Sequence, residues 1–328
     1  MGRVASLADH LAGSLPPPSG AVVMGTGIVS IGLSLDGHEA LSRVLLGLAA
    51  AVWFVLGAGL LILVTRLRPR LLREARSPAA LTGVAGTDVF GARLEMLGWS
   101  REAAALLAIA FLLWLVLVPY VLSHWQRPAV GSSFVLVVAT ESLATLAAAI
   151  VVAHPAATWL ALAALAWVGL GLVFYVFVAV GFDLRQLLVG RGDHWVAGGA
   201  LAIATLACGR VAKAAPVIGV LRGAAGSLGL AALALWAAAA VWLPALLLAE
   251  VGRPRPSYDP RRWSTVFPLG MYAVCSFTVA DVQGIAGLRR FAAVWIWFAF
   301  AIWAVVSVGL ARRVLRTVRR ARPVCGIS

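Results

Sequence analysis

The chain has 328 residues, of which 62% are apolar or aromatic and only 12% are charged, with a formal net charge of +14. A soluble domain carries about 25% charged residues, and a mean hydropathy of +0.96 excludes both a soluble enzyme and a disordered chain. In a membrane protein the basic excess indicates loops facing anionic lipid, not nucleic-acid binding. A transmembrane β-barrel is excluded because its strands alternate polar and apolar residues over about ten positions. The composition therefore predicts an all-α polytopic membrane protein.

Ten apolar segments follow one another along the chain, and a helix needs about 20 such residues to cross the hydrocarbon core. They are residues 20–36, 41–65, 77–92, 102–123, 130–153, 156–181, 194–213, 226–249, 264–284 and 291–311. The third is the weakest, because it contains Thr82, Thr87 and Asp88. We therefore expect a cytoplasmic N-terminal segment (1–19), a ten-helix transmembrane domain (20–311) and a basic cytoplasmic tail (312–328).

The basic residues are distributed unevenly between the loops. If successive loops alternate between the two sides of the membrane, the side that holds both termini carries 19 Lys and Arg residues and the other side carries 8. Loops rich in Lys and Arg stay in the cytoplasm. The count predicts that both termini are cytoplasmic and that the protein is a multi-pass protein of the plasma or inner membrane.

The odd-numbered segments differ in character from the even-numbered ones. The odd segments are rich in Gly, Ser and Thr, whereas the even segments are mostly Leu, Ala, Val and Trp. Small and hydroxylated helices suit close packing or a polar path, and bulky apolar helices suit lipid. We expect five helical hairpins, with an inner ring of odd helices inside an outer ring of even helices. For any single glycine, close packing alone is an equally good explanation.

Three strings of residues point to a known family. Residues Met24–Ser30 open the first segment, Trp195–Ala207 fill the seventh, and Val266–Tyr272 open the ninth, which Trp263 precedes. In these strings and in the order of its segments the chain resembles the tellurite-resistance/dicarboxylate transporter family, which includes the guard-cell slow anion channel and the malate and sulfite transporters. The resemblance implies five hairpins around a central pore, assembly as a homotrimer, and movement of a small anionic solute across the lipid bilayer.

Phe267 is the sharpest candidate for a functional residue. The resemblance implies that this Phe, on the ninth segment, blocks the pore. Pro268 lacks the N–H that would bond the carbonyl of Ser264, so the helix is expected to kink there. A bulky ring at a kink would occlude a narrow pore until it moves. The alternative is a Phe that packs against a neighbouring helix.

Candidates for the pore lining lie at helical spacing on the first, seventh and ninth segments. A lining of small residues and hydroxyls suits weak, fast passage of an anion, although packing stripes have the same sequence pattern. The candidates are Gly20, Gly27, Ser30, Ser34, Gly198, Ala202, Thr205, Gly209, Gly270, Met271, Val274 and Thr278.

Several charged residues lie in or beside the segments. Glu141 is read as the only acid near the middle of one, and Thr145 lies one helical turn away. Because an ionised carboxylate at this depth costs about 2.5–3.5 kcal/mol, Glu141 is either a proton carrier in proton-coupled transport or a structural residue. Asp88, Asp281 and Arg93 lie toward segment ends. Arg210 and Lys213 also lie near a segment end and either attract anions to a pore mouth or anchor the helix at the interface.

The resemblance implies a transporter or channel for small anions such as C4-dicarboxylates (malate among them) or oxyanions, with sulfite or tellurite efflux as the alternative. No cofactor, metal or nucleic acid is expected. An intramembrane redox enzyme would need inward His or Cys ligands. The histidines lie in loops or at segment ends, and the three cysteines form no CxxC pair. The sequence separates neither channel from carrier nor one anion from another.

Overall fold

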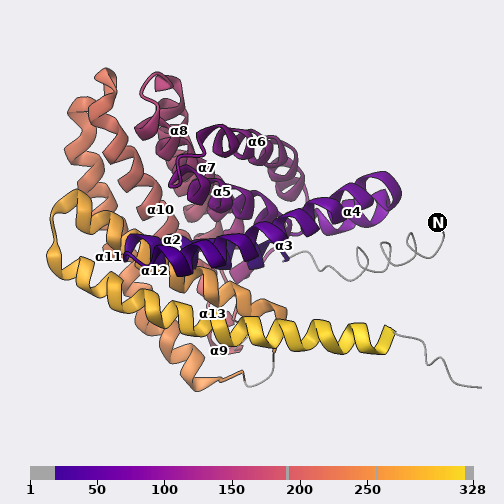
Figure 1. Cartoon of the computed structure of the whole chain (residues 1–328). Coiled ribbons are helices and arrows are strands. Elements are labelled where there is room, and N and C mark those ends of the chain that lie inside the picture. The colour runs from indigo at the N-terminus through magenta and orange to yellow at the C-terminus, as the bar shows by residue number, and fades with distance from the viewer. Residues whose placement is uncertain (1–18, 190–191, 256–257, 322–328) are drawn as a thin grey trace, which may run out of the picture.

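The computed structural model describes residues 19–189, 192–255 and 258–321, with helices labelled as in Figure 1. In these ranges the chain is helical and forms no strand, apart from one isolated bridge between Ala129 and Phe182. The predicted all-α class is confirmed. Residues 1–18 of the expected N-terminal segment and residues 322–328 of the expected tail lie outside the described ranges.

In the described ranges, a long helix occupies each of the ten predicted segments. They are α2 (Gly20–Leu35), α3 (Glu39–Arg66), α5 (Thr82–Glu95), α6 (Ser100–Ser123), α7 (Val135–Ala153), α8 (Thr158–Val180), α10 (Trp195–Ala214), α11 (Ala225–Gly252), α12 (Trp263–Gln283) and α13 (Ala286–Ala321). Two short α-helices are α4 (Arg68–Glu74) and α9 (Gln186–Val189), and the 3-10 turns are η2 (Pro78–Leu81), η3 (Gly131–Phe134), η4 (Ala215–Val217), η5 (Gly219–Ala224) and η6 (Pro260–Arg262).

Eight of the helices in the described ranges are long and apolar enough to cross a membrane, which makes the chain a multi-pass membrane protein. The helix α2 is apolar but has only 16 residues, and α5 has 14 and follows the turn η2. The ten-span count therefore stays a prediction. The last helix runs on past the predicted end of its segment, so residues 312–321 of the expected tail are helical.

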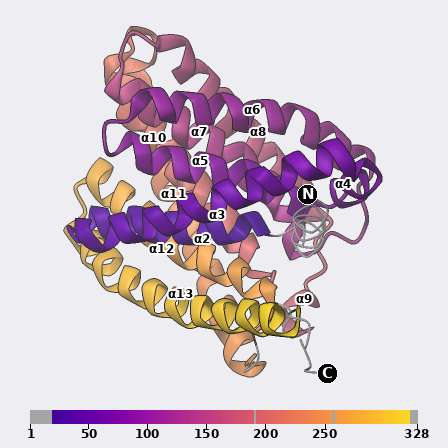
Figure 2. The same ribbon diagram turned by 45° about the vertical axis from the view of Figure 1, so that its right-hand side comes forward.

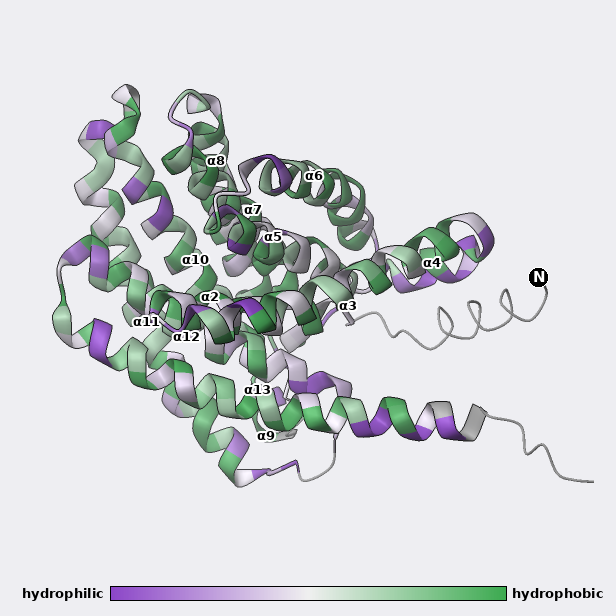
Figure 3. Ribbon diagram, viewed as in Figure 1, coloured by the Kyte–Doolittle hydropathy of each residue, from purple (hydrophilic) through white to green (hydrophobic). Residues whose placement is uncertain are grey.

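Burial separates the helices into two classes that follow the alternation in composition. In α7, α10 and α12 the apolar stretch is 89–94% buried, whereas in α3, α6, α8, α11 and α13 it is only 11–28% buried. Nearly every residue of α2 and α5 is buried as well. Figure 3 shows hydrophobic residues along most of α3 and α6, which is the surface expected to face lipid.

The five buried helices contact one another in a closed circle. The helix α2 packs against α5, α5 against α7, α7 against α10, α10 against α12, and α12 against α2 again. We call these five helices the inner ring. Each one also packs against the exposed helix that follows it in the chain, as α12 does against α13 in Figures 1 and 2.

Indole N–H groups of the exposed helices donate hydrogen bonds to hydroxyls of the inner ring. The pairs are Trp53 with Thr87 (2.9 Å), Trp114 with Thr140 (3.0 Å), Trp236 with Ser276 (2.8 Å) and Trp303 with Thr26 (3.0 Å). Each bond joins the exposed helix of one helix pair to the inner helix of the next pair around the circle. Because a bilayer offers no water to an unpaired indole N–H, these bonds hold neighbouring pairs in register.

We expect Trp114 and Thr140 to be energetically coupled. Thr140→Val removes the acceptor of the Trp114 indole. Its cost in unfolding free energy should therefore be larger in the wild type than in a protein that already carries Trp114→Phe. The expected difference is about 0.6 kcal/mol, the average for hydrogen bonds between membrane helices. Reversible unfolding of the two single variants and the double variant in detergent measures this difference. The control is Thr26→Val, whose hydroxyl serves Trp303: its effect should simply add to that of Trp114→Phe. Additive effects of Thr140→Val and Trp114→Phe would contradict the coupling.

Candidate functional site

Phe267 is 2% exposed and lies on α12, which continues through Pro268 as a helix. The next residue, Pro268, packs against Gly199 of α10, where an added Cβ would lie 2.8 Å from the proline Cγ. Gly270, which is three residues after Phe267, packs against Ile28 of α2. Because successive helical residues turn by about 100°, Phe267 lies between the face that contacts α10 and the face that contacts α2. Its ring therefore points toward the middle of the inner ring.

Three residues follow Phe267 at helical spacing and lie on the same face of α12. They are Met271, Val274 and Thr278, and all three are buried. The Thr278 hydroxyl donates to the carbonyl of Val274 at 3.1 Å, so its hydrogen is engaged within the helix. This side of α12 is consequently apolar, with no charged residue between Phe267 and Asp281.

The other predicted lining residues lie at contacts between helices. Gly20 and Gly27 face Thr82 and Val89 of α5, and Gly198 and Gly209 face Tyr272 and Thr278 of α12. Ala202 and Thr205 are fully buried, and the Thr205 hydroxyl donates to the Leu201 carbonyl. Ser30 and Ser34 bond to Ser42 and Glu39 at the start of α3. Close packing accounts for these positions, as the alternative in the sequence analysis anticipated, and their role in lining a pore stays a prediction.

A buried arginine ties three helices together where α5 ends. Arg93 is fully buried, and its Nε donates to the Ser42 hydroxyl at 3.0 Å. Its Nη2 donates to both carboxylate oxygens of Glu39 at 2.7 Å. Ser42 also exchanges hydrogen bonds with Ser30 of α2. The sequence showed Arg93 only as a charge near a segment end, because its partners lie about fifty residues away.

A second network lies where α10 begins. The Arg255 guanidinium pairs with Glu250 at 2.8 Å and donates to the Thr265 hydroxyl at 3.0 Å, and the Trp195 indole donates to Glu250 at 3.2 Å. His194 precedes this helix, and burial lowers the pKa of its imidazole below the ordinary value. Among the described residues, no group of three or more His, Cys, Asp or Glu side chains is arranged to hold a metal.

Glu141 lies on α7 and is fully buried. Its carboxyl group contacts Gly171 on the inward face of α8, and within the described ranges neither oxygen has a hydrogen-bond partner. The Thr145 hydroxyl donates to the main-chain carbonyl of Glu141 at 2.9 Å, and not to its carboxyl group. The side chain therefore points toward an exposed helix and away from the middle of the inner ring, which favours the structural alternative.

Asp88 is a buried acid that the sequence analysis misplaced. The third segment was predicted over residues 77–92, which set Asp88 near its end, but α5 spans Thr82–Glu95 and Asp88 lies at its middle. The residue is 1% exposed, and its Oδ2 accepts a hydrogen bond from Ser142 of α7 at 2.8 Å.

The basic residues predicted near a pore mouth differ in their surroundings. Lys213 forms an ion pair with Asp281 of α12 at 3.0 Å, and Arg289 of α13 pairs with the same carboxylate at 2.7 Å. Arg210 is half-buried on α10, one turn before Lys213. Asp281 acts on the Arg210 guanidinium through its charge, without a direct ion pair within the described residues.

Comparison with known proteins gives a family match over most of the chain. The family described as voltage-dependent anion channel matches residues 14–311. Two curated proteins are similar: uncharacterized membrane proteins from two strains of Mycobacterium tuberculosis, CDC 1551 and H37Rv. Each is 29% identical over 168 residues, which cover 44% of this chain and 80% of the relative.

We expect Glu39→Gln to destabilise the protein by about 1.5–3 kcal/mol, because it leaves the buried Arg93 guanidinium without an opposite charge. Thermal unfolding of purified protein in detergent measures the loss. The matched control is Arg43→Gln, which removes the exposed cation bonded to the same carboxylate and should cost less than about 1 kcal/mol. Equal losses in the two variants would contradict a special role for the buried pair.

Proposed function

Because the chain belongs to the voltage-dependent anion channel family, the same family identified from its sequence as the tellurite-resistance/dicarboxylate transporters, we propose that it moves small anions across the cell membrane through the middle of the inner ring. The closed circle of five buried helices inside five exposed ones supports this proposal. Under this proposal all ten long helices cross the bilayer as five hairpins, both termini are cytoplasmic, and the protein assembles as a homotrimer.

The proposed gate is Phe267, with Pro268 beside it. Its ring faces the middle of the inner ring, between the contacts of α12 with α10 and with α2. Met271, Val274 and Thr278 continue the same face and would line the path beyond the gate. An apolar constriction of this kind stops an anion because the ion would have to shed its water without gaining new partners.

The proposed substrates are C4-dicarboxylates such as malate, or small oxyanions, with sulfite or tellurite as the alternative. Members of this family are transporters and channels, which agrees with a protein that is not an enzyme. Uptake or efflux by proteoliposomes offered a panel of these anions, with and without an imposed pH gradient, separates the substrates and distinguishes a passive channel from a proton-coupled carrier.

Phe267→Ala should raise anion flux per folded molecule, because it removes the ring that closes the path. Liposome efflux or bilayer conductance, normalised to monodisperse protein, measures the change. The matched control is Phe277→Ala, which truncates an equally buried Phe on the same helix that contacts Arg289. Truncating a Phe that only packs costs about 3–5 kcal/mol on the soluble-core scale and opens nothing. Flux at or below the wild-type level in folded Phe267→Ala protein would contradict the gate.

We also propose that Arg210 attracts anions to one mouth of the path, because Asp281 is already shared by Lys213 and Arg289. Arg210→Gln should then lower flux several-fold at low anion concentration, with a smaller effect at high salt, where the charge is screened. The control is Arg222→Gln, which removes an exposed cation just beyond α10 whose guanidinium bonds the Pro216 carbonyl. Equal effects of the two substitutions would indicate surface charge alone.

A further inference from the structure

Asp88 and Ser142 form a hydrogen-bonded pair between two helices of the inner ring, and the pair is short of one hydrogen. The Ser142 hydroxyl lies 2.8 Å from Asp88 Oδ2 and 2.9 Å from the carbonyl oxygen of Ala139. A hydroxyl carries one hydrogen, so beside an ionised Asp88 that hydrogen is shared between the carboxylate and a carbonyl that already accepts the helical N–H of Leu143. The other carboxylate oxygen, Oδ1, is buried without a hydrogen-bond partner among the described residues. A proton on Oδ2 completes the set: the acid donates to Ser142, and Ser142 donates to Ala139.

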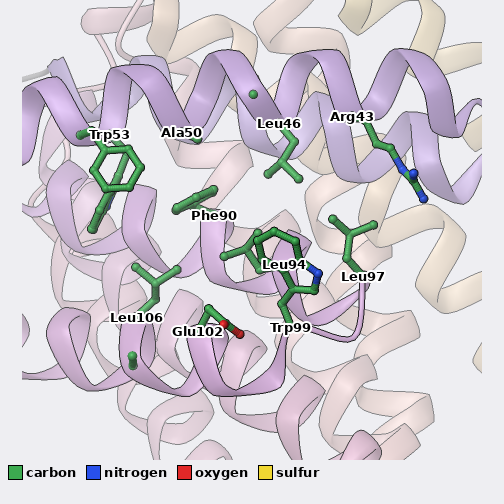
Figure 4. Close-up of a pocket in the computed structure, with 13 residues that line it drawn as sticks. Arg43, Leu46, Ala50, Trp53, Phe90, Leu94, Leu97, Trp99, Glu102 and Leu106 are labelled. Atoms are coloured by element: carbon green, nitrogen blue, oxygen red, sulfur yellow. The ribbon is translucent and has the colours of Figure 1, made fainter.

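The neighbours of Asp88 on α5 show which way it faces. Thr87 accepts the bond from Trp53 of α3, and Val89 packs against Gly27 of α2. Phe90 packs against Trp53 in a pocket lined by residues of α3, α5 and α6 (Figure 4). Because α3 and α6 are exposed helices, this side of α5 is turned away from the middle of the inner ring. Because Phe90 is turned about 200° from Asp88, Asp88 lies on the opposite side of α5, toward the middle of the ring.

Among the residues that the structure describes, Asp88 forms no ion pair with a cation. In the described ranges α2 and η2 contain no titratable side chain, and the single one of α7 is Glu141, which faces α8. On α5 itself, Arg93 bonds Glu39 and Ser42, and Glu95 accepts from Ser100. The charged or titratable residues of α3 and α6 lie toward their ends; they are Glu39, Arg43, Arg66, Arg101, Glu102 and Tyr120.

The charge of Asp88 would act on an anion in the middle of the inner ring. An unpaired carboxylate facing the path would repel an anion strongly, because few water molecules screen charges in such a place. The neutral acid exerts no such repulsion. Glu141, which is also buried, lies on the side of α7 that faces α8, where its charge would affect an anion less.

We propose that Asp88, held by Ser142, is the proton-binding site of the inner ring, and that anions pass while Asp88 holds its proton. This inference rests on the proposed function and names the residue that links anion flux to protons. The only chemical change is transfer of a proton between the Asp88 carboxyl group and water. Wild-type flux should therefore be high at acidic pH and fall as the pH rises.

The first test compares two substitutions that each replace a buried acid by its amide. In Asp88→Asn the amide N–H still donates to Ser142, so flux should stay at the acidic wild-type level at every pH. Glu141→Gln, the matched control, should retain the pH dependence of the wild type. Efflux of malate, sulfite and nitrate from proteoliposomes over a pH series measures both. Wild-type pH dependence in Asp88→Asn, or its loss in Glu141→Gln, would overturn the proposal.

The second test does not depend on flux. Infrared difference spectra should show a carboxylic-acid C=O band at neutral pH in the wild type that Asp88→Asn lacks and Glu141→Gln keeps. Ser142→Ala should shift that band, and it replaces Asp88→Asn if the latter fails to fold. A band unchanged by either substitution would overturn the proton site. Wild-type liposomes without anion flux would instead contradict the proposed function, while the infrared band would still decide whether Asp88 holds a proton.

Discussion

The lack of water in the bilayer is the constraint on which the rest of this structure depends, because every buried donor must find its partner within the protein. The four indole–hydroxyl bonds show how the chain meets it. Each tryptophan lies on an exposed helix, where its ring suits lipid, and its N–H reaches a hydroxyl on the inner helix of the neighbouring pair. Three of these hydroxyls, on Thr87, Thr140 and Ser276, also donate to the carbonyl four residues earlier, so they both give and receive. The alternation of hydroxyl-rich and Trp-rich segments is therefore a bonding pattern as well as a difference in polarity.

The same constraint shapes the middle of the inner ring. The hydroxyls of Thr87, Thr140 and Ser276 accept hydrogen bonds from tryptophans of exposed helices. The Thr278 hydroxyl donates to the carbonyl of Val274, so the face of α12 that carries Phe267 has no free hydroxyl hydrogen at Thr278. The charged networks lie at the ends of the inner helices instead: Arg93 with Glu39 where α5 ends, and Arg255 with Glu250 where α10 begins. Ion pairs at the ends and a middle without ion pairs is the distribution expected for a path that collects ions at its mouths and excludes them until a gate moves.

Within the described ranges a helix lies at each of the ten segments that the sequence predicted, and burial follows the predicted alternation, because both depend on local composition. That all ten cross the membrane stays a prediction. The sequence did not predict which way each polar side chain points, because that depends on contacts between residues far apart in the chain. Ser30 has the same helical spacing as a pore-lining residue, yet it bonds Ser42 of α3. Asp88 was assigned to a segment end because the third segment was predicted over residues 77–92, whereas α5 runs from Thr82 to Glu95 and places Asp88 at its middle. The family strings, which are local, gave the family correctly, whereas the roles of individual glycines needed their neighbours in space.

Two of the buried acids, Glu141 and Asp88, show why residue type alone does not assign a role. Glu141 and Asp88 are both inaccessible to solvent, and both lie within helices of the inner ring. Glu141 sits against Gly171, where the missing side chain leaves room for the carboxyl group and where no hydroxyl of the described residues bonds it. Asp88 instead shares a hydroxyl with a neighbouring inner helix in a set that one added proton completes. A carboxyl group whose bonding pattern changes with a single proton, at the contact between two helices of the ring, can transmit that change to the ring. Glu141 lies on the side of α7 that faces α8, and within the described ranges its carboxyl group has no hydrogen bond through which it could act on the other inner helices.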